Sequence, residues 1–144
     1  MINIYNGDIK LFTNTTINKG FSENKLQEDE IYKIINRAYT INGWKYYKFK
    51  LININNLDFM LELVYKESNL EMCSIMHYGS FEEIPFSTEN EIKRQHIHNQ
   101  WLVSMLGEPS ESMDWGIKYK FAWGEISSVY SPQTPESAIF FKWI

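Results

Sequence analysis

Three histidines and one cysteine are the residues of this chain best suited to bind a metal or act as a nucleophile. His96 and His98 lie two positions apart in an expected helix, about 200° apart around its axis, so they cannot share a metal ion. His77 falls on an expected strand without a cysteine pair or an acidic ligand at a known spacing. Cys73 stands in mid-strand, away from the electropositive helix start that activates a thiol. We therefore predict no metal, no cofactor and a structural role for Cys73.

Paired carboxylates are the next candidates for chemistry. Glu62 and Glu71 lie on two expected strands that can pair across a short turn, and two such groups can divide acid and base roles. Exposed polar faces of the strands explain both residues more simply. The sequence contains no glycine-rich phosphate loop and no Gly-x-Ser-x-Gly elbow. No catalytic residue is predicted.

Acidic residues gather in the second half of the chain. The 14 basic and 18 acidic residues give a net charge of 14 − 18 = −4. Residues 1–72 are balanced at nine and nine, so residues 73–144, with five basic and nine acidic, carry the whole −4. A negative chain is a poor general ligand for nucleic acid, because phosphate binding needs Lys and Arg. The alternatives for the acidic stretch are a solvated face and a surface that attracts a basic partner.

Aromatic residues make up 16% of the chain, and residues of the classes AVILMFWYC make up 44%. This composition indicates a folded domain rather than a disordered or collagen-like chain. The aromatic excess has two explanations: a well-filled core, or a binding face, since Trp and Tyr dominate interface hot spots. A single cysteine excludes a disulfide framework.

Spacing and capping signals predict a helix in each half of the chain. In the first half, Ser22 is a plausible N-cap, and an apolar stripe predicts helical structure that ends at Asn42-Gly43; its members are Ile31, Ile34, Ile35 and Ala38. The acidic run 28–30 interrupts this pattern, so two short helices are possible. In the second half, Thr88 and Glu91 fit a capping box, and Gly107 followed by Pro109 marks the end. The main helix is therefore expected at about 88–106. We expect its His98 to pack beside Trp101 and Leu102, with the polar tip of the ring at the rim.

Strand patterns fill most of the remaining sequence. Alternation and turn residues predict strands over 44–51, 57–65, 70–78, 115–123, 126–130 and 138–144. Runs of strands with short turns favour antiparallel pairing. We predict one α+β domain over 1–144: an antiparallel β-sheet with the main helix packed on it, plus an N-terminal helical segment.

A weak internal repeat of 1–72 and 73–144 is suggested by two tripeptides. Tyr47-Lys48-Phe49 recurs as Tyr119-Lys120-Phe121, at an offset of half the chain. Both triplets fall in expected aromatic strands.

The second half carries a pattern that resembles small bacterial proteins, some of them associated with toxin–immunity loci. The pattern consists of His98-x-x-Trp101-Leu102, Leu106-Gly107-x-Pro109, the run 121–130 (FAWGEISSVY) and Ser137-x-Ile139-x-Phe141. Those proteins often read W-G-x-I-x-S-x-Y-D, and Ser131 stands here where Asp is usual. The resemblance covers about residues 95–144 and implies a toxin-neutralising binding protein.

A looser similarity is to the helix-then-sheet modules of β-lactamase inhibitor proteins and of a lipoprotein of outer-membrane assembly. There too a helix ends in L-G-x-P before antiparallel strands. This chain has neither the lipoprotein signal nor the disulfides of the secreted inhibitors. The similarity therefore implies architecture rather than activity.

Our first hypothesis is an immunity protein that neutralises a toxin, for example a basic nuclease, by occluding its working surface. The expected contacts are carboxylates with an aromatic anchor: Glu82, Glu83, Glu108, Glu111, Asp114 and Trp115. The alternatives are a small-molecule-binding module or enzyme with an aromatic-lined pocket, and a homo-oligomeric structural protein. The N-terminus has no signal-peptide pattern and no apolar run approaches a membrane span, so a cytoplasmic protein is expected. The oligomeric state stays open.

Overall fold

The structure is a computed structural model that describes residues 1–12, 14–79, 87–134 and 136–144. The first half of the chain contains β1 (Ile9–Lys10), β2 (Thr16–Ile17), α1 (Glu23–Glu28), the 3₁₀-helix η1 (Glu30–Ile34), β3 (Ile35–Ile41), β4 (Trp44–Ile54), β5 (Leu57–Lys66) and β6 (Asn69–His77). The second half contains α2 (Thr88–Leu106), β7 (Glu111–Met113), β8 (Gly116–Phe121), β9 (Gly124–Ser131) and β10 (Glu136–Trp143).

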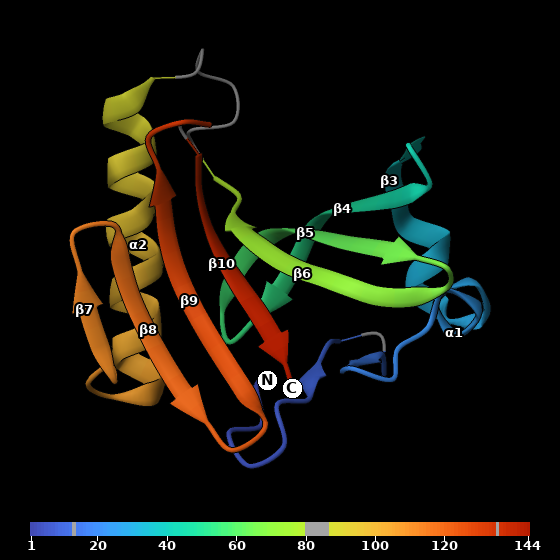
Figure 1. Cartoon of the computed structure of the whole chain (residues 1–144), viewed down its shortest axis with the longest axis horizontal. Helices are drawn as coiled ribbons and strands as arrows, with labels where there is room; N and C mark the ends of the chain where they lie inside the picture. The colour runs from blue at the N-terminus through green and yellow to red at the C-terminus, as the bar shows by residue number, and fades with distance from the viewer. Residues whose placement is uncertain (13, 80–86, 135) are drawn as a thin grey trace.

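The main sheet has eight strands in the order β3-β4-β5-β6-β10-β9-β8-β7, and every neighbouring pair is antiparallel. Each half of the chain supplies a helical segment and a four-stranded meander, and the last strands of the two meanders meet in the middle (Figure 1). The predicted α+β class, with an antiparallel sheet, one main helix and a small N-terminal helix, is confirmed.

The two matching tripeptides occupy equivalent places in this arrangement. Tyr47 to Phe49 lie in β4 and Tyr119 to Phe121 in β8, each the second strand of its meander. Both tyrosines are buried and both hydroxyls bond toward the helix of their own half: Tyr47 to Glu23 Oε2 and Tyr119 to the carbonyl of Gly107. An origin of the two halves by duplication stays a prediction.

Both helices pack on the same face of the sheet. Along β5, Phe59, Leu61, Leu63 and Tyr65 alternate onto one side and are all buried. Phe59 contacts Trp101 of α2, with ring centroids 4.7 Å apart, whereas the Tyr65 hydroxyl donates to the carbonyl of Phe21 beside α1 at 2.9 Å. One hydrophobic core therefore runs under both helices.

The first predicted helix is wrong beyond Ile34. The residues of the predicted apolar stripe belong to two different elements. Ile31 is buried in η1, whereas Ile35 begins strand β3, which includes Ala38 and pairs with β4. Asp29 separates α1 from η1, since its side chain accepts the N–H of Ile31. β-Branched isoleucines suit an extended chain, and sheet pairing outweighs the helical spacing here.

The main helix has the predicted bounds, 88–106, and only its N-cap differs. The N-cap is Ser87 rather than Thr88: the Ser87 hydroxyl accepts the N–H of Asn90 at 3.0 Å. Gly107 closes the helix with its N–H on the carbonyl of Val103. No helix of the described residues is long and apolar enough to cross a membrane.

Strand boundaries agree best for β5 and β6 of the first meander. β5 and β6 match the expected 57–65 and 70–78 to within one residue, while β4 runs on to Ile54 through a bulge after Phe49. The expected strand 115–123 shortens to β8, and β1, β2 and β7 were not predicted. Short strands escape pattern recognition because two or three residues cannot show a period.

Candidate binding surface on the open sheet face

The sheet face opposite the helices lacks a covering element among the described residues, and we call it the open face. The register places on it the alternate positions of each strand, such as Met60 opposite Met76 and Lys48 opposite Glu62. Figure 1 looks onto the part formed by β8 and β9, with α2 behind them. A partner that binds this face would contact the side chains of the strands directly.

The centre of the open face is apolar and hollowed. A depression of about 340 Å³ lies where β5, β6 and β10 meet. We name its apolar lining the methionine hollow: Met60, Met72, Met76, Ala138 and Phe140. Four polar residues complete the lining of the depression: Lys48, Glu62, Ser74 and Glu136. Met72 is 42% exposed. Methionine is flexible and polarizable, and therefore suits a surface that adapts to a partner.

Ion pairs stand around this apolar centre. On the β4 side, Lys48 Nζ lies 3.5 Å from Glu62 Oε2. On the far side, Lys118 Nζ lies 3.6 Å from Glu125 Oε1, and Lys120 pairs with Glu111. An apolar centre with a polar border is the usual anatomy of a protein–protein interface.

The described acidic residues that we expected at a partner interface lie along the edge strand β7 and its flanking turns. Glu108 follows α2, Glu111 is in β7, and Asp114 and Trp115 follow that strand. Glu108 and Asp114 are exposed, whereas Glu111 is neutralised by Lys120, whose hydrogen bond lowers the Glu111 pKa. Glu82 and Glu83 lie outside the described residues. The structure therefore brings the four described residues to one edge but leaves only part of their charge uncompensated.

Trp115 is held in place by its backbone and its neighbours. Its carbonyl accepts the Gln95 side chain at 2.7 Å and the N–H of Tyr130 at 2.9 Å. Lys118 Nζ lies 5.7 Å from its ring centroid. The half-buried ring is thus a fixed part of the β7 edge.

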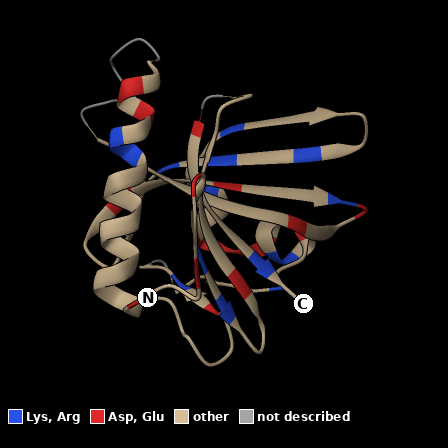
Figure 2. Ribbon diagram, turned by 60° about the vertical axis from the view of Figure 1, so that its left-hand side comes forward, with Lys and Arg blue, Asp and Glu red and all other residues tan. Residues whose placement is uncertain are grey.

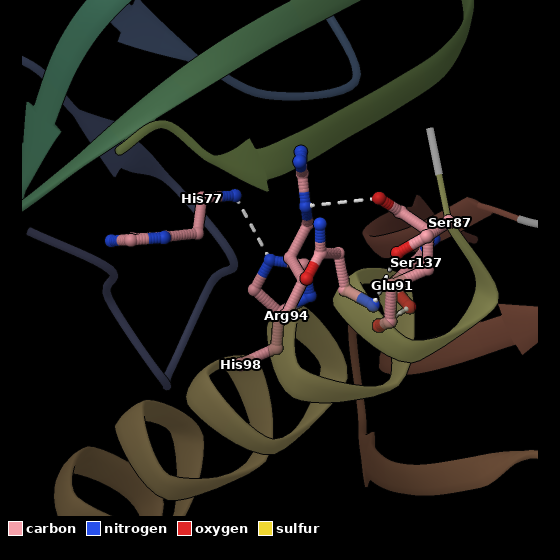
Figure 3. A network of polar contacts seen from close by, with 7 residues as sticks. His77, Ser87, Glu91, Arg94, His98 and Ser137 are labelled. Atoms are coloured by element: carbon pink, nitrogen blue, oxygen red, sulfur yellow. Dashed lines mark hydrogen bonds and ion pairs between the residues drawn. The ribbon is translucent and has the colours of Figure 1, made fainter. Parts of the chain in front are cut away.

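A polar cluster is buried between the first turns of α2 and the sheet (Figure 3). Glu91, Arg94 and His98 point inward from the helix and are at most 6% exposed. Glu91 accepts the N–H of Ser137 at 3.0 Å and lies 3.5 Å from Arg94 Nε. These contacts tie α2 to β10 and give the helix a polar inner stripe where an apolar one is usual.

His98 is fully buried, so its predicted position with a polar tip at the rim is wrong. Its Nε2 accepts the backbone N–H of His77 at 2.9 Å, which assigns its proton to Nδ1. Burial lowers its pKa to about 3, with Arg94 and His77 adding to the effect. A neutral, enclosed imidazole of this kind positions β6 against α2 and has no contact with solvent.

Burial, ion pairing and strand register explain the other residues considered for catalysis, which are Cys73, Glu62 and Glu71. Cys73 is buried, and burial raises the pKa of its thiol. Glu62 pairs with Lys48 and faces Ser74, whereas Glu71 stands at the bulge of β6 and has no register partner in β5, so the two carboxylates do not face each other. Among the described residues, no three His, Cys, Asp or Glu side chains gather closely enough to hold a metal.

The Trp123-Gly124 motif fastens the N-terminal segment to the second meander. Trp123 Nε1 donates to the carbonyl of Ile4 at 2.9 Å, and Trp143 Nε1 donates to that of Gly7 at 3.0 Å. Gly124 has φ +152°, and an added Cβ would stand 2.0 Å from the carbonyl oxygen of Lys142. The motif therefore has a structural explanation.

The methionine hollow was missed as a site by the sequence interpretation. Alternation in 57–65 and 70–78 identifies two faces of each strand, and the face opposite the core already carries Met60 and Val64 beside Asp58 and Glu62. This mixed polarity was the available signal. Only the order of the strands shows that β10 adds Phe140 to the same face.

Comparison of the chain with protein-family models, curated proteins and solved structures gives no match.

Proposed function

We propose that this chain is a binding protein whose open face covers a partner protein. The methionine hollow carries this proposal. An antiparallel sheet with one face in water normally has polar residues on that face. Here the centre of that face carries three methionines and Phe140 among its polar residues, and contiguous exposed apolar surface marks interaction sites.

The partner we propose is a toxin domain that the chain neutralises by occlusion. Support for the toxin comes from the resemblance of residues 95–144 to proteins of toxin–immunity loci. Support for occlusion comes from the position of the apolar centre in the middle of a broad sheet rather than in a deep pocket. Glu108, Glu111, Asp114 and Trp115, at the β7 border, stay candidates for contacts with a basic part of the same partner.

The test compares two surface substitutions of equal exposure. Met72→Glu places a charge in the methionine hollow, and Val103→Glu places one on the outer surface of α2, where Val103 is 40% exposed against 42% for Met72. The probe is the purified protein encoded by the gene next to the one for this chain. Its binding to the wild-type chain and to each variant is measured by isothermal titration calorimetry. M72E is expected to weaken binding at least about tenfold, and V103E to leave it unchanged.

Three outcomes would contradict the proposal. The first is that the wild-type chain does not bind the neighbouring product, and the second is that M72E binds as tightly as wild type. The third is sedimentation of the chain alone as a dimer that M72E disrupts and V103E does not, which would assign the open face to a second copy. Circular dichroism of both variants checks that they fold.

A further inference from the structure

One corner of the open face combines cations with stacked aromatic rings, and we call it the basic corner: Arg37, Tyr39, Trp44, Tyr46 and Lys66. The register places all five on the open face, since Tyr39 is opposite Tyr46 and Trp44 is opposite Lys66. Figure 2 shows basic residues along β3 and β4, which contain no acidic residue, and an acidic tip at the turn that follows Lys66. In a chain of net charge −4, this concentration is local.

The two cations of the corner differ from their paired neighbours. Lys48 has Glu62, and Lys45 has Glu23 at 3.2 Å. Arg37 and Lys66 are exposed and, within the part of the chain that the structure describes, have no carboxylate at ion-pair distance. Their charge is therefore available to a partner.

Each of these cations lies over an aromatic ring. The Arg37 guanidinium lies 4.8 Å from the Tyr39 ring centroid, and Tyr39 stacks on Tyr46 at 4.8 Å with 3° between the planes. Lys66 Nζ lies 4.9 Å from the Trp44 centroid. A guanidinium over a ring still has N–H groups to donate, and its fork geometry suits bidentate binding of a carboxylate.

The corner is continuous with the methionine hollow. Lys48 and Glu62 line the hollow and lie next to Arg37 and Tyr46 in the sheet. From the strand spacing and rise, Arg37 and Lys66 stand about 10 Å apart across the strands and about 13 Å apart along them. One partner surface can therefore contact the hollow and both cations.

We propose that the basic corner binds carboxylates of the partner protein, so that the partner surface is acidic next to its apolar contact. The inference rests on the proposed function and specifies the partner's chemistry at this corner. A protein partner is favoured over single-stranded nucleic acid because the adjoining hollow is lined largely by apolar side chains, and of its three charged residues Lys48 is paired with Glu62 and Glu136 is a further carboxylate. Nucleic acid instead needs a continuous cationic track.

The test uses defined probes and a charge-matched control. The variant Arg37→Glu/Lys66→Glu reverses the corner, and Lys33→Glu/Lys93→Glu reverses two exposed cations of η1 and α2, with the same change in net charge. The probes are an acidic peptide of Glu-Gly-Leu repeats, its counterpart with Lys in place of Glu, and an oligothymidylate. Binding is followed through the amide chemical shifts of the isotopically labelled chain.

The acidic peptide is expected to shift amides of β3 to β5 and to lose affinity about tenfold in R37E/K66E but not in K33E/K93E. A stronger response to the Lys peptide or the oligothymidylate, no response to the acidic peptide, or equal binding by R37E/K66E would overturn the inference.

The neighbouring-gene product separates this inference from the proposed function. Loss of its binding in M72E with full binding in R37E/K66E would leave the proposed function standing and overturn the acidic partner surface. Failure of that protein to bind, with the acidic peptide bound at the corner, would overturn the proposed partner and support the surface chemistry.

Discussion

His98 shows how one buried side chain links this fold to pH. The ring is enclosed by Phe59 and by the backbone of His77, and its neutral form is the one that accepts the His77 N–H. Its pKa is about 3 in the folded chain, against an ordinary value of 6.5. Between these values the unfolded chain binds a proton that the folded chain does not.

The stability of the chain is therefore expected to fall as the pH drops below about 6.5. The contribution of His98 is fully present above that pH and is lost progressively toward pH 3, which amounts to about 2 kcal/mol between pH 7 and pH 5. Urea unfolding at the two pH values measures it. His98→Gln should make the pH dependence shallower, and His96→Gln, at an exposed position, should not. An unchanged slope in H98Q would contradict the buried neutral ring.

The polar inner stripe of α2 explains why sequence reasoning misplaced His98. The position of His98 beside Trp101 and Leu102 predicts an amphipathic residue at the border of an apolar stripe. Its burial depends on β6, which contributes the His77 N–H from twenty-one positions away in sequence. A pattern within one helix contains no information about that partner.

At the start of α2, only one of two neighbouring hydroxyl residues acts as the N-cap. Ser87 has extended backbone angles and its hydroxyl accepts the Asn90 N–H, whereas Thr88 is the first residue of the helix. The capping-box pattern at Thr88 and Glu91 predicted the right region and the wrong residue. Glu91 instead turns inward to Ser137.

Ser87→Ala is expected to destabilise the chain by about 1 kcal/mol, because it leaves a first-turn N–H without its acceptor. Thr88→Ala should stay within about 0.5 kcal/mol, since Thr88 is not the cap. Urea midpoints of the two variants measure the difference. A larger loss in T88A than in S87A would return the cap to Thr88.

The two meanders are joined by a short seam between β6 and β10. Three register pairs form it: Ile139 with Ile75, Phe140 with Ser74, and Phe141 with Cys73. Ile139 and Ile75 are buried on the helix face, and Phe140 contributes to the methionine hollow on the other. The seam therefore unites the core and shapes the candidate binding surface.

Ile139→Ala is expected to destabilise the chain by about 2 to 5 kcal/mol, through lost burial and the cavity left behind. Because the core is continuous across the seam, unfolding should remain a single transition by both circular dichroism and tryptophan fluorescence. Ile41→Ala, the same substitution at a residue 52% exposed in β3, serves as the control and should cost under 1 kcal/mol. Separate transitions for the two probes would show that the halves unfold independently.

Local sequence signals correctly predicted those elements whose environment produces a pattern in adjacent residues. The alternation of Leu57 to Tyr65 and the end of α2 at Gly107 agree with the structure, because a half-buried strand and a helix end leave a pattern in adjacent residues. The same signals extended a helix through Ile35 and Ala38, where pairing with β4 prevails. Of the expected interface, the sequence identified the acidic residues but not how they are distributed over the fold.

The sequence alone established an acidic, aromatic-rich α+β chain with a main helix over 88–106, since composition and local periodicity depend only on neighbours in the chain. The three-dimensional arrangement was needed for the order β6-β10 at the centre of the sheet, which places Met60, Met76 and Phe140 on one surface. It was needed also to show that Glu111 is neutralised and that Arg37 and Lys66 are not. Charges and apolar side chains act through space, and residues far apart in the sequence become neighbours only when the strands pair.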